Sequence, residues 1–552
     1  MGPLERAVTD SWIQTKIRQL TLEQKVGQML IAGFPGTTPT PEVARVVQHC
    51  HLGGVMLWEA NVESPVQTAA LTADLQRLSI GDAGLPLLVC LDQEGGAVSR
   101  LDDPATIMPS AMALGATRSL DHVRAWARAL GAEMRALGIN ADFAPVLDVN
   151  SEPANPVIGI RSFGDSPSLV AEMGVASIEA LHEADIMATA KHFPGHGGTT
   201  ADSHLDLPVI RRSRELLRAV DLPPFQAAIA RGVDMVMTAH AVYPALASDH
   251  LPATMSGEIL TDLLRNKMGF QGLIVTDALV MSAIAERYTL AEAAAQSIQA
   301  GADLALVLTT LDEQVQVFEE LLQAVRRGEI SETRIDASVS RILVAKARLA
   351  FTPTVDGLDF AAWPIEEHRR VARDIALDSV TLVKNEAGLL PLRLQRGERL
   401  GVIEFGGARF SPVEDPVCEN GWLRRLFNGR HANLCYLCLD PTLKAGEAEM
   451  GSIVEGCDVL VVVTRNANII RQQSSLVRRI VDSGKPTVVA AVRGPYDVMS
   501  FPAVGSYVVS YGDAPASLEA LVEVLFGDHL PKGRLPVAIP GLFPYGHGLE
   551  GF

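Results

Sequence analysis

The sequence predicts an α/β protein in which an N-terminal (β/α)8 barrel of the TIM type is followed by a smaller α/β sandwich domain. The chain of 552 residues is longer than one hydrophobic core usually organises. Short apolar runs alternate with longer amphipathic stretches over its first two-thirds, and a proline-rich segment then breaks the pattern. We place the barrel at residues 1–350, the linker at 351–370 and the sandwich domain at 371–552.

The predicted barrel strands are short apolar runs, most of which are separated by helix-like patterns such as the one at 168–184. A continuous apolar run indicates a strand buried on both faces, and helices between such strands indicate parallel neighbours. The runs are Val26–Phe34, Leu52–Trp58, Leu85–Asp92, Phe143–Asn150, Ile186–Phe193, Met235–His240, Gly272–Leu279 and Leu304–Leu308. Eight such units predict a closed barrel.

Polar side chains stand at the ends of five of these runs, which is where a barrel carries its functional residues. A polar residue can also simply mark the point where a strand becomes a loop. A Lys-His pair together with repeated Asp at one rim favours binding or catalysis instead. These residues are Asp92, Asp148, Asn150, Lys191, His192, His240 and Asp277.

A second alternating series follows the linker and predicts a three-layer domain, with one sheet between helices. Its expected strands are 379–385, 399–405, 431–439, 457–464, 486–492 and 506–512. The stretch GVIEFGGARF at 401–410 has neither of the glycine patterns that bind nucleotides. We therefore expect no cofactor in this domain.

The composition is that of an ordinary globular enzyme, with 48% hydrophobic and 20% charged residues. The 47 Lys and Arg residues against 65 Asp and Glu residues give a net charge of −18, which argues against a nucleic acid or an anionic membrane as partner. The first residues lack the apolar core of a signal peptide, and no apolar run has membrane-spanning length. We expect a cytoplasmic protein.

The six cysteines are scattered along the chain, mostly among apolar neighbours. Only Cys435 and Cys438 have CxxC spacing, and they lie in an apolar run without a second pair. We expect buried, reduced thiols rather than a zinc or redox site.

The catalytic candidates are Asp277 and the sequence Asp202-Ser203-His204. A carboxylate at the mouth of a barrel is costly to desolvate, so Asp277 is expected to have partners or a task, and nucleophile is the plausible task. An imidazole needs a partner to fix its tautomer, and Asp202 stands two residues from His204 on a glycine- and proline-rich stretch. The alternative is that Asp202 caps a turn and His204 is solvated.

A metal site is the competing interpretation of the same region, because His192 and His196 are four residues apart. Pro194 and Gly195 stand between them, so they need not share a helix face as in HExxH. At this point a barrel metallohydrolase remains open.

The sequence resembles glycoside hydrolase family 3, and specifically its β-N-acetylglucosaminidase branch, over almost the whole chain. The strongest element is KHFPGH followed by DSHLDLP, at 191–208. LDQEGG, RSFGD and VTDAL occur in the expected order, and the stretches at 379–392, 484–497 and 532–549 resemble the second domain of the family.

The resemblance implies removal of terminal β-linked N-acetylglucosamine (GlcNAc) with retention of configuration, without cofactor or metal. Asp277 would attack the anomeric carbon to give a covalent glycosyl-enzyme, and His204, oriented by Asp202, would act as acid and then base, where the usual scheme has two carboxylates. The loop that carries this Asp202–His204 dyad would move to complete the site after the substrate binds. The sugar-holding positions are Asp92, Arg100, Arg161, Lys191 and His192, with His240 as a weaker candidate.

Two departures from the family pattern concern fine specificity. Gly198 stands where family members often carry Asp, and Ala278 stands where an acidic residue is frequent. Both differences remove charge near the expected site.

Three other functions remain open on sequence grounds. Phosphate could replace water as the acceptor, because a neutral His repels an incoming anion less than a carboxylate does. The enzyme could be a β-glucosidase of the same family. A non-catalytic sugar-binding protein on this scaffold would need a damaged active centre, whereas Asp277, His204 and Asp202 are all present.

Overall fold

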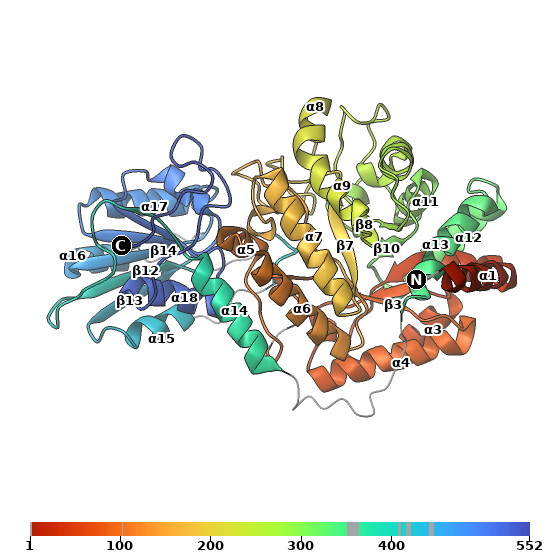
Figure 1. The fold of residues 1–552 in the computed structure, drawn as a ribbon, viewed down its shortest axis with the longest axis horizontal. Coiled ribbons are helices and arrows are strands. Elements are labelled where there is room, and N and C mark those ends of the chain that lie inside the picture. The colour runs from red at the N-terminus through yellow and green to blue at the C-terminus, as the bar shows by residue number, and fades with distance from the viewer. Residues whose placement is uncertain (1–2, 102, 350–363, 407–409, 416–420, 441–446) are drawn as a thin grey trace.

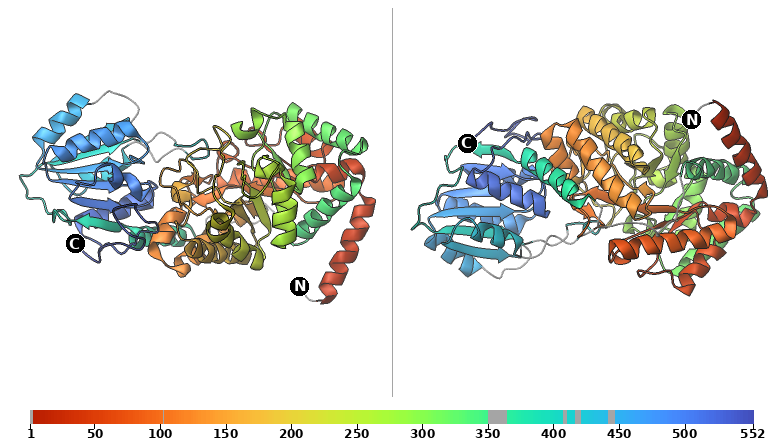
Figure 2. Two further views of the ribbon diagram at one scale, coloured as in Figure 1. Left: turned by 90° about the horizontal axis from the view of Figure 1, so that it is seen from above. Right: turned by 60° about the horizontal axis from the view of Figure 1, so that its bottom comes forward.

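The computed structural model describes residues 3–101, 103–349, 364–406, 410–415, 421–440 and 447–552. Two large sheets organise the chain, and they lie side by side along its longest axis (Figures 1 and 2). The parallel sheet of the N-terminal part forms the predicted barrel, and a second sheet forms the C-terminal domain.

The barrel consists of eight parallel strands in the order β10-β1-β2-β3-β6-β7-β8-β9. A further parallel bridge between Val275 and Leu304 joins the last strand to the first, so the sheet closes. Every residue of these strands is buried, as the continuous apolar runs predicted. The strands are β1 Leu30–Ala32, β2 Gly54–Met56, β3 Leu88–Leu91, β6 Ala141–Asp142, β7 Met187–Phe193, β8 Met235–Thr238, β9 Leu273–Val275 and β10 Ala305–Val307.

One predicted strand is displaced. The run Phe143–Asn150 was expected to be a strand, but β6 is Ala141–Asp142 and ends just before that run. Pro145 has no backbone N–H to donate to a neighbouring strand, and beyond it only Val146 bridges, to Lys191. The rest of the run is extended, buried loop at the carboxyl end of the barrel.

The helices cover the outside of the barrel and begin at residues that favour a helix start. Ser119 and Ser166 cap α6 and α7, and Thr310 forms a capping box with Glu313 at the start of α12. The helices of this part are α1 Pro3–Gln19, α2 Leu22–Gly27, α3 Pro41–His49, α4 Pro65–Ala83, α5 Ala111–Thr117, α6 Leu120–Ala136, α7 Pro167–Glu183, α8 Arg214–Leu216, α9 Leu222–Ala230, α10 Ser282–Ala285, α11 Leu290–Ala300, α12 Leu311–Arg326 and α13 Glu332–Lys346.

The predicted linker lies mostly outside the described residues, since positions 350–363 are not described. Its last part belongs to a helix, α14 Ile365–Ser379, which runs along the boundary between the two sheets beside α5 and α6 (Figure 1).

The C-terminal domain has a six-stranded sheet in the order β11-β16-β15-β14-β12-β13, parallel except for β11, which is antiparallel to β16. All six predicted runs form these strands. They are β11 Thr381–Asn385, β12 Leu400–Phe405, β13 Leu434–Leu439, β14 Val459–Thr464, β15 Thr487–Ala491 and β16 Ser506–Val509.

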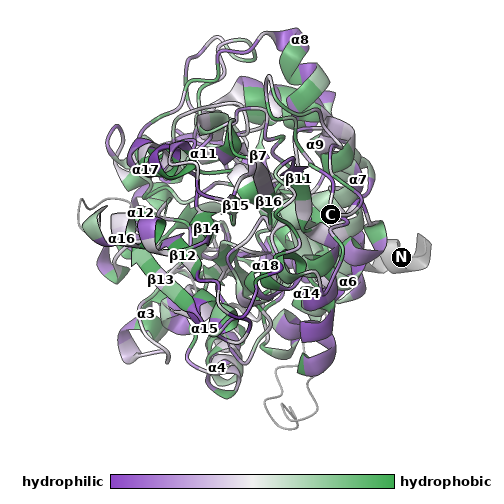
Figure 3. Cartoon of the chain, turned by 90° about the vertical axis from the view of Figure 1, so that its left-hand side faces the viewer, coloured by the Kyte–Doolittle hydropathy of each residue, from purple (hydrophilic) through white to green (hydrophobic). Residues whose placement is uncertain are grey.

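Helices cover both faces of this sheet, which gives the expected three layers. Alternate residues of each strand belong to separate apolar clusters, so that Val461 packs toward one layer of helices and Val462 toward the other. In Figure 3 the green strands lie at the centre, and the flanking helices carry purple segments. The helices are α15 Trp422–Asn428, α16 Glu447–Gly456, α17 Arg471–Asp482 and α18 Pro515–Phe526.

The expectation of buried cysteines is only partly correct. Cys50, Cys90 and Cys457 are buried, but Cys438 is exposed and Cys435 is half-buried. Both lie on β13, which is an edge strand of the sheet and has a neighbour on one side only. Cys418 lies outside the described residues.

The two domains share an apolar interface. Met112 and Ala113 of α5 belong to the same buried cluster as Tyr511 and Leu535 of the C-terminal domain. The Ser110 hydroxyl donates to the carbonyl of Tyr511 at 2.6 Å. Because these contacts bury side chains from both domains together, the interface fixes their relative position.

Candidate active site at the carboxyl end of the barrel

Asp277 lies just beyond β9, at the carboxyl end of the barrel. One of its carboxylate oxygens accepts the N–H of Ala278 at 2.8 Å. Burial raises the pKa of the Asp277 carboxyl, but His240, His192, His204 and this N–H outweigh burial, so its pKa stays below the ordinary value. Asp277 is therefore an ionised carboxylate at neutral pH, which is the state a nucleophile needs.

Asp202 and His204 form the pair that the sequence predicted. His204 Nδ1 lies 2.7 Å from Asp202 Oδ1, and the backbone N–H of His204 donates to the same oxygen at 2.9 Å. Burial raises the pKa of Asp202, but its contacts with His204 and Ser411 outweigh burial and bring the pKa below its ordinary value. Asp202 is therefore an ionised carboxylate. Since a carboxylate only accepts, Nδ1 carries the donated proton and Nε2 is left to exchange protons with a ligand.

The loop that carries this pair is held against the segment that follows Asp277. Arg287 pairs with Asp206 at 2.9 Å, and the N–H of Ala283 donates to the carbonyl of Ser203 at 3.4 Å. On the other side, the Ser203 hydroxyl lies 3.0 Å from His196 Nε2. His204 is consequently close enough to Asp277 to help lower the pKa of its carboxyl.

Four predicted sugar-holding residues lie around one further carboxylate, Glu94. Lys191 Nζ lies 2.6 Å from Glu94 and 2.7 Å from Asp92. Arg161 binds both oxygens of Glu94, at 2.7 and 2.8 Å. Arg161 and Lys191 together hold the pKa of Glu94 far below its usual range despite complete burial. His192 completes the group, with Nε2 3.5 Å from Arg161 Nη2.

Asp148 fixes the orientation of His192. His192 Nδ1 lies 2.7 Å from Asp148 Oδ2, and the N–H of His196 donates to Oδ1 at 2.6 Å. Asp148 is fully buried, which raises its pKa, but these contacts lower it below the ordinary value. The imidazole Nε2 of His192 therefore faces the site in a fixed tautomer.

His240 has a different environment from the one expected. It is fully buried, with Nε2 3.0 Å from the carbonyl of Ala278 and Nδ1 2.7 Å from the Thr254 hydroxyl. In this geometry neither ring nitrogen is free for a sugar hydroxyl, and the ring instead holds the backbone beside Asp277.

Arg100 is engaged by the C-terminal domain. Its Nη1 lies 2.5 Å from Asp415 Oδ1, its Nη2 donates to the carbonyl of Val413 at 2.8 Å, and its nearest approach to Asp92 is 4.0 Å. The guanidinium also lies over the Trp58 ring. Arg100 thus joins the barrel rim to the other domain, and its role in holding the sugar stays a prediction.

Two groups of site residues escaped the sequence reasoning. The first is Glu94, which had a local signal, an acidic residue two positions after the apolar run that ends at Asp92, but was assigned no role. The second is Ser411 and Asp415, which had no local sequence signal because they reach the site only when the domains dock.

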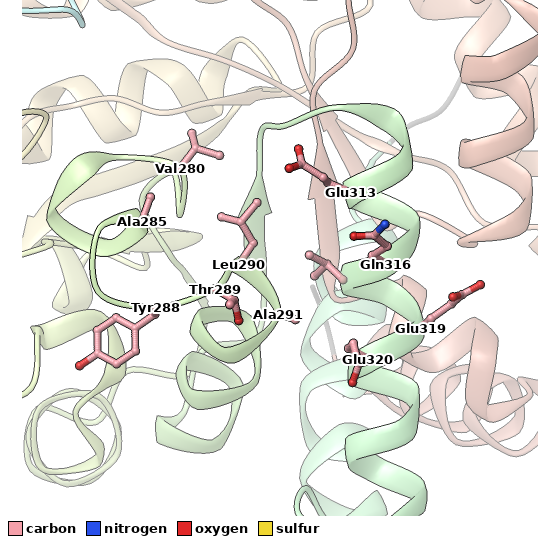
Figure 4. A pocket seen from close by; sticks show the side chains of 11 residues that line it. Val280, Ala285, Tyr288, Thr289, Leu290, Ala291, Glu313, Gln316, Glu319 and Glu320 are labelled. Atoms are coloured by element: carbon pink, nitrogen blue, oxygen red, sulfur yellow. The ribbon is translucent and has the colours of Figure 1, made fainter.

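The described residues contain no group of three or more His, Cys, Asp or Glu side chains that could hold a metal ion. A surface pocket of about 560 Å³ lies between residues 280–291 and α12 (Figure 4). Glu313, Glu319 and Glu320 line it, and none of the predicted site residues does. Within the described ranges, no helix is long and apolar enough to cross a membrane.

Two domain families match the chain. Residues 21–345 match the Glycosyl hydrolase family 3 N terminal domain, and residues 380–542 match the Glycosyl hydrolase family 3 C-terminal domain. With the ionised carboxylate and the His–Asp pair at the barrel mouth, these matches define the class of protein, a two-domain glycoside hydrolase. The chain belongs to glycosyl hydrolase family 3.

Similar proteins align along nearly the full chain. Beta-hexosaminidase A of Pseudoalteromonas piscicida is 30% identical, with 94% of this chain and 97% of that protein covered. A beta-N-acetylglucosaminidase/beta-glucosidase of Cellulomonas fimi is 31% identical, with 96% and 95% covered. The solved structure of a family 3 beta-N-acetylglucosaminidase from Paenibacillus sp. str. FPU-7 is 36% identical, with a TM-score of 0.86 and 94% and 99% covered.

Proposed function

We propose that this glycoside hydrolase is a retaining exo-β-N-acetylglucosaminidase that uses Asp277 as nucleophile and the Asp202–His204 pair as acid and base. The observation that carries the proposal is the position of the pair, on a loop that contacts the segment following Asp277. The similar hexosaminidases support GlcNAc as the sugar.

In the first step, an Asp277 oxygen bonds to the anomeric carbon while the bond from that carbon to the leaving oxygen breaks. His204 Nε2 gives its proton to the leaving oxygen, and Asp202 stabilises the imidazole through Nδ1. In the second step, water attacks the same carbon, the bond to Asp277 breaks, and His204 takes a proton from the water. Two inversions at one carbon give net retention.

The experiment is hydrolysis of an aryl β-N-acetylglucosaminide, with NMR detection of the first anomer released. We expect the β-anomer, and we expect Asp277→Ala to lower kcat by about 1,000-fold or more, because the covalent step is lost. Asp262→Ala, at an exposed carboxylate on the barrel surface, is the control and should match the wild type. An unchanged rate in Asp277→Ala would refute the mechanism.

A second candidate is activity on β-glucosides, because the Cellulomonas fimi relative is named for both activities. Comparing aryl glucoside with aryl N-acetylglucosaminide at matched concentrations separates the two. The same assay with added phosphate, followed by detection of sugar 1-phosphate, distinguishes phosphorolysis from hydrolysis.

A further inference from the structure

A short loop of the C-terminal domain, residues 410–415, reaches the carboxyl end of the barrel and contacts two separate parts of the site. The Ser411 hydroxyl lies 2.8 Å from Asp202 Oδ2. Asp415 binds Arg100 and accepts the N–H of Ser99 at 2.5 Å, and its own N–H donates to the carbonyl of Ala97 at 2.9 Å. The loop therefore bridges the dyad and the rim of the barrel.

Buried charges at the strand ends of the second sheet hold this loop in place. Arg493, just beyond β15, lies 3.0 Å from Glu414 Oε1 and 3.0 Å from Asp513 Oδ2. Its guanidinium also lies over the ring of Phe410, 5.4 Å from the centroid. Arg493 is 2% exposed, so these contacts are shielded from solvent.

The contact between Ser411 and Asp202 completes the hydrogen bonding of the dyad carboxylate. Asp202 Oδ1 accepts from His204, through Nδ1 and the backbone, and Oδ2 accepts from Ser411. Ser411 and Asp202 are 2% and 5% exposed. With donors on both oxygens, the carboxylate plane is fixed, and the direction of His204 Nε2 is fixed with it.

We propose that Ser411 is a positioning residue for acid/base catalysis, supplied to the barrel by the C-terminal domain. The inference rests on the proposed role of the Asp202–His204 pair as acid and base. It assigns the second domain a part in proton transfer, because the dyad is fully hydrogen-bonded only when the loop 410–415 is docked.

The loop should keep its position when the Ser411 hydroxyl is removed. Asp415, Glu414 and Phe410 anchor it through Arg100 and Arg493, and none of these contacts involves Ser411. A Ser411→Ala variant therefore tests one hydrogen bond and leaves the loop docked.

The experiment measures kcat/KM of wild type, Ser411→Ala and Ser411→Thr on aryl glycosides whose leaving groups differ in acidity. A poor leaving group needs a well-placed acid, whereas a dinitrophenolate leaves without one. We expect Ser411→Ala to lose about tenfold on the 4-methylumbelliferyl substrate and less than about twofold on the 2,4-dinitrophenyl substrate. Ser411→Thr, which keeps the hydroxyl, should restore most of the loss.

Tyr545→Phe is the matched control, because it also deletes a hydroxyl that bonds across the domains, to Arg118, without contacting the dyad. It should show no dependence on the leaving group. An equal loss on both substrates in Ser411→Ala, or no loss, would overturn the inference.

The same series can be run on aryl glucosides if the wild type prefers them, so a wrong sugar assignment alone leaves this test intact. A wild type that cleaves neither series would refute the proposed function and this inference together.

Discussion

Glu94 is the residue on which the geometry of the predicted sugar-holding group depends. It is 4% exposed and pairs with both Arg161 and Lys191, while Asp92, among the residues the structure describes, has Lys191 as its one partner within hydrogen-bond distance. Breaking a buried pair by removing one partner leaves an uncompensated charge, which costs far more than losing a surface pair. Glu94 fixes the Arg161 and Lys191 side chains through these ion pairs, so that their remaining N–H groups can donate to a ligand.

Glu94→Gln should therefore weaken both folding and activity. We expect the free energy of unfolding to fall by about 3 kcal/mol and kcat/KM to fall by about 100-fold, mainly through KM, because the cationic side chains lose their fixed directions. Urea unfolding and steady-state kinetics measure the two effects. Glu320→Gln, on the exposed face of α12, is the control. Wild-type KM in Glu94→Gln would contradict the assigned role.

At the scale of elements, the strands were predictable and the loops at their carboxyl ends were only partly so. Apolar runs and strand burial both follow from local composition, so each predicted run contains or adjoins a strand. β6 is displaced because Pro145, which has no N–H to donate, breaks the regular ladder of its run, although Ala144 and Leu147 still bond to β7. Within the C-terminal domain, Asp497 lies in the 3-10 helix Pro495–Ser500 after β15 and is completely buried. No local sequence pattern predicted this burial.

Asp497 should make the stability of the C-terminal domain depend on pH. Burial raises the pKa of Asp497 to about 7, from 3.8. Because the pKa of Asp497 is higher in the folded than in the unfolded state, its protonated form favours folding. This contribution to stability is complete below pH 4 and is lost as the pH rises to 7, where the folded protein must hold a buried carboxylate. Asp497→Asn stays neutral, so its stability relative to wild type should increase between pH 5 and 8, by about 2–4 kcal/mol.

Thermal unfolding at several pH values between 5 and 8 checks this expectation. Asp482→Asn, at an exposed carboxylate on α17, should show a constant difference from wild type over the same range. A flat difference for Asp497→Asn as well would show that its carboxyl titrates normally.

For the whole molecule, the apolar cluster shared by the two domains should couple their unfolding. Met112 of α5 is fully buried in a cluster that includes Tyr511 and Leu535 of the other domain. Interfaces that are large and apolar make two domains behave as one cooperative unit, whereas small polar ones allow relative motion. The position of Ser411 on the dyad depends on this coupling.

Met112→Asp should separate the two domains energetically. We expect scanning calorimetry to show one transition for the wild type and two for the variant, with a destabilisation of about 3 kcal/mol or more, because a charge is buried at the interface. Met499→Asp, at an exposed methionine of the C-terminal domain, should keep the single transition. Two transitions in the wild type would show that the domains unfold independently.

The sequence by itself determined the barrel, the three-layer second domain and the adjacency of Asp202 and His204, because each depends on neighbours within a few residues. Tertiary structure decided what those residues face. Arg100 turns to Asp415 and His240 to Ala278, while Glu94 gathers Arg161 and Lys191. Ser411 reaches Asp202 from 209 residues away. Such contacts form only when separate elements dock, and the docking depends on the packing of whole surfaces, to which no short stretch of sequence corresponds.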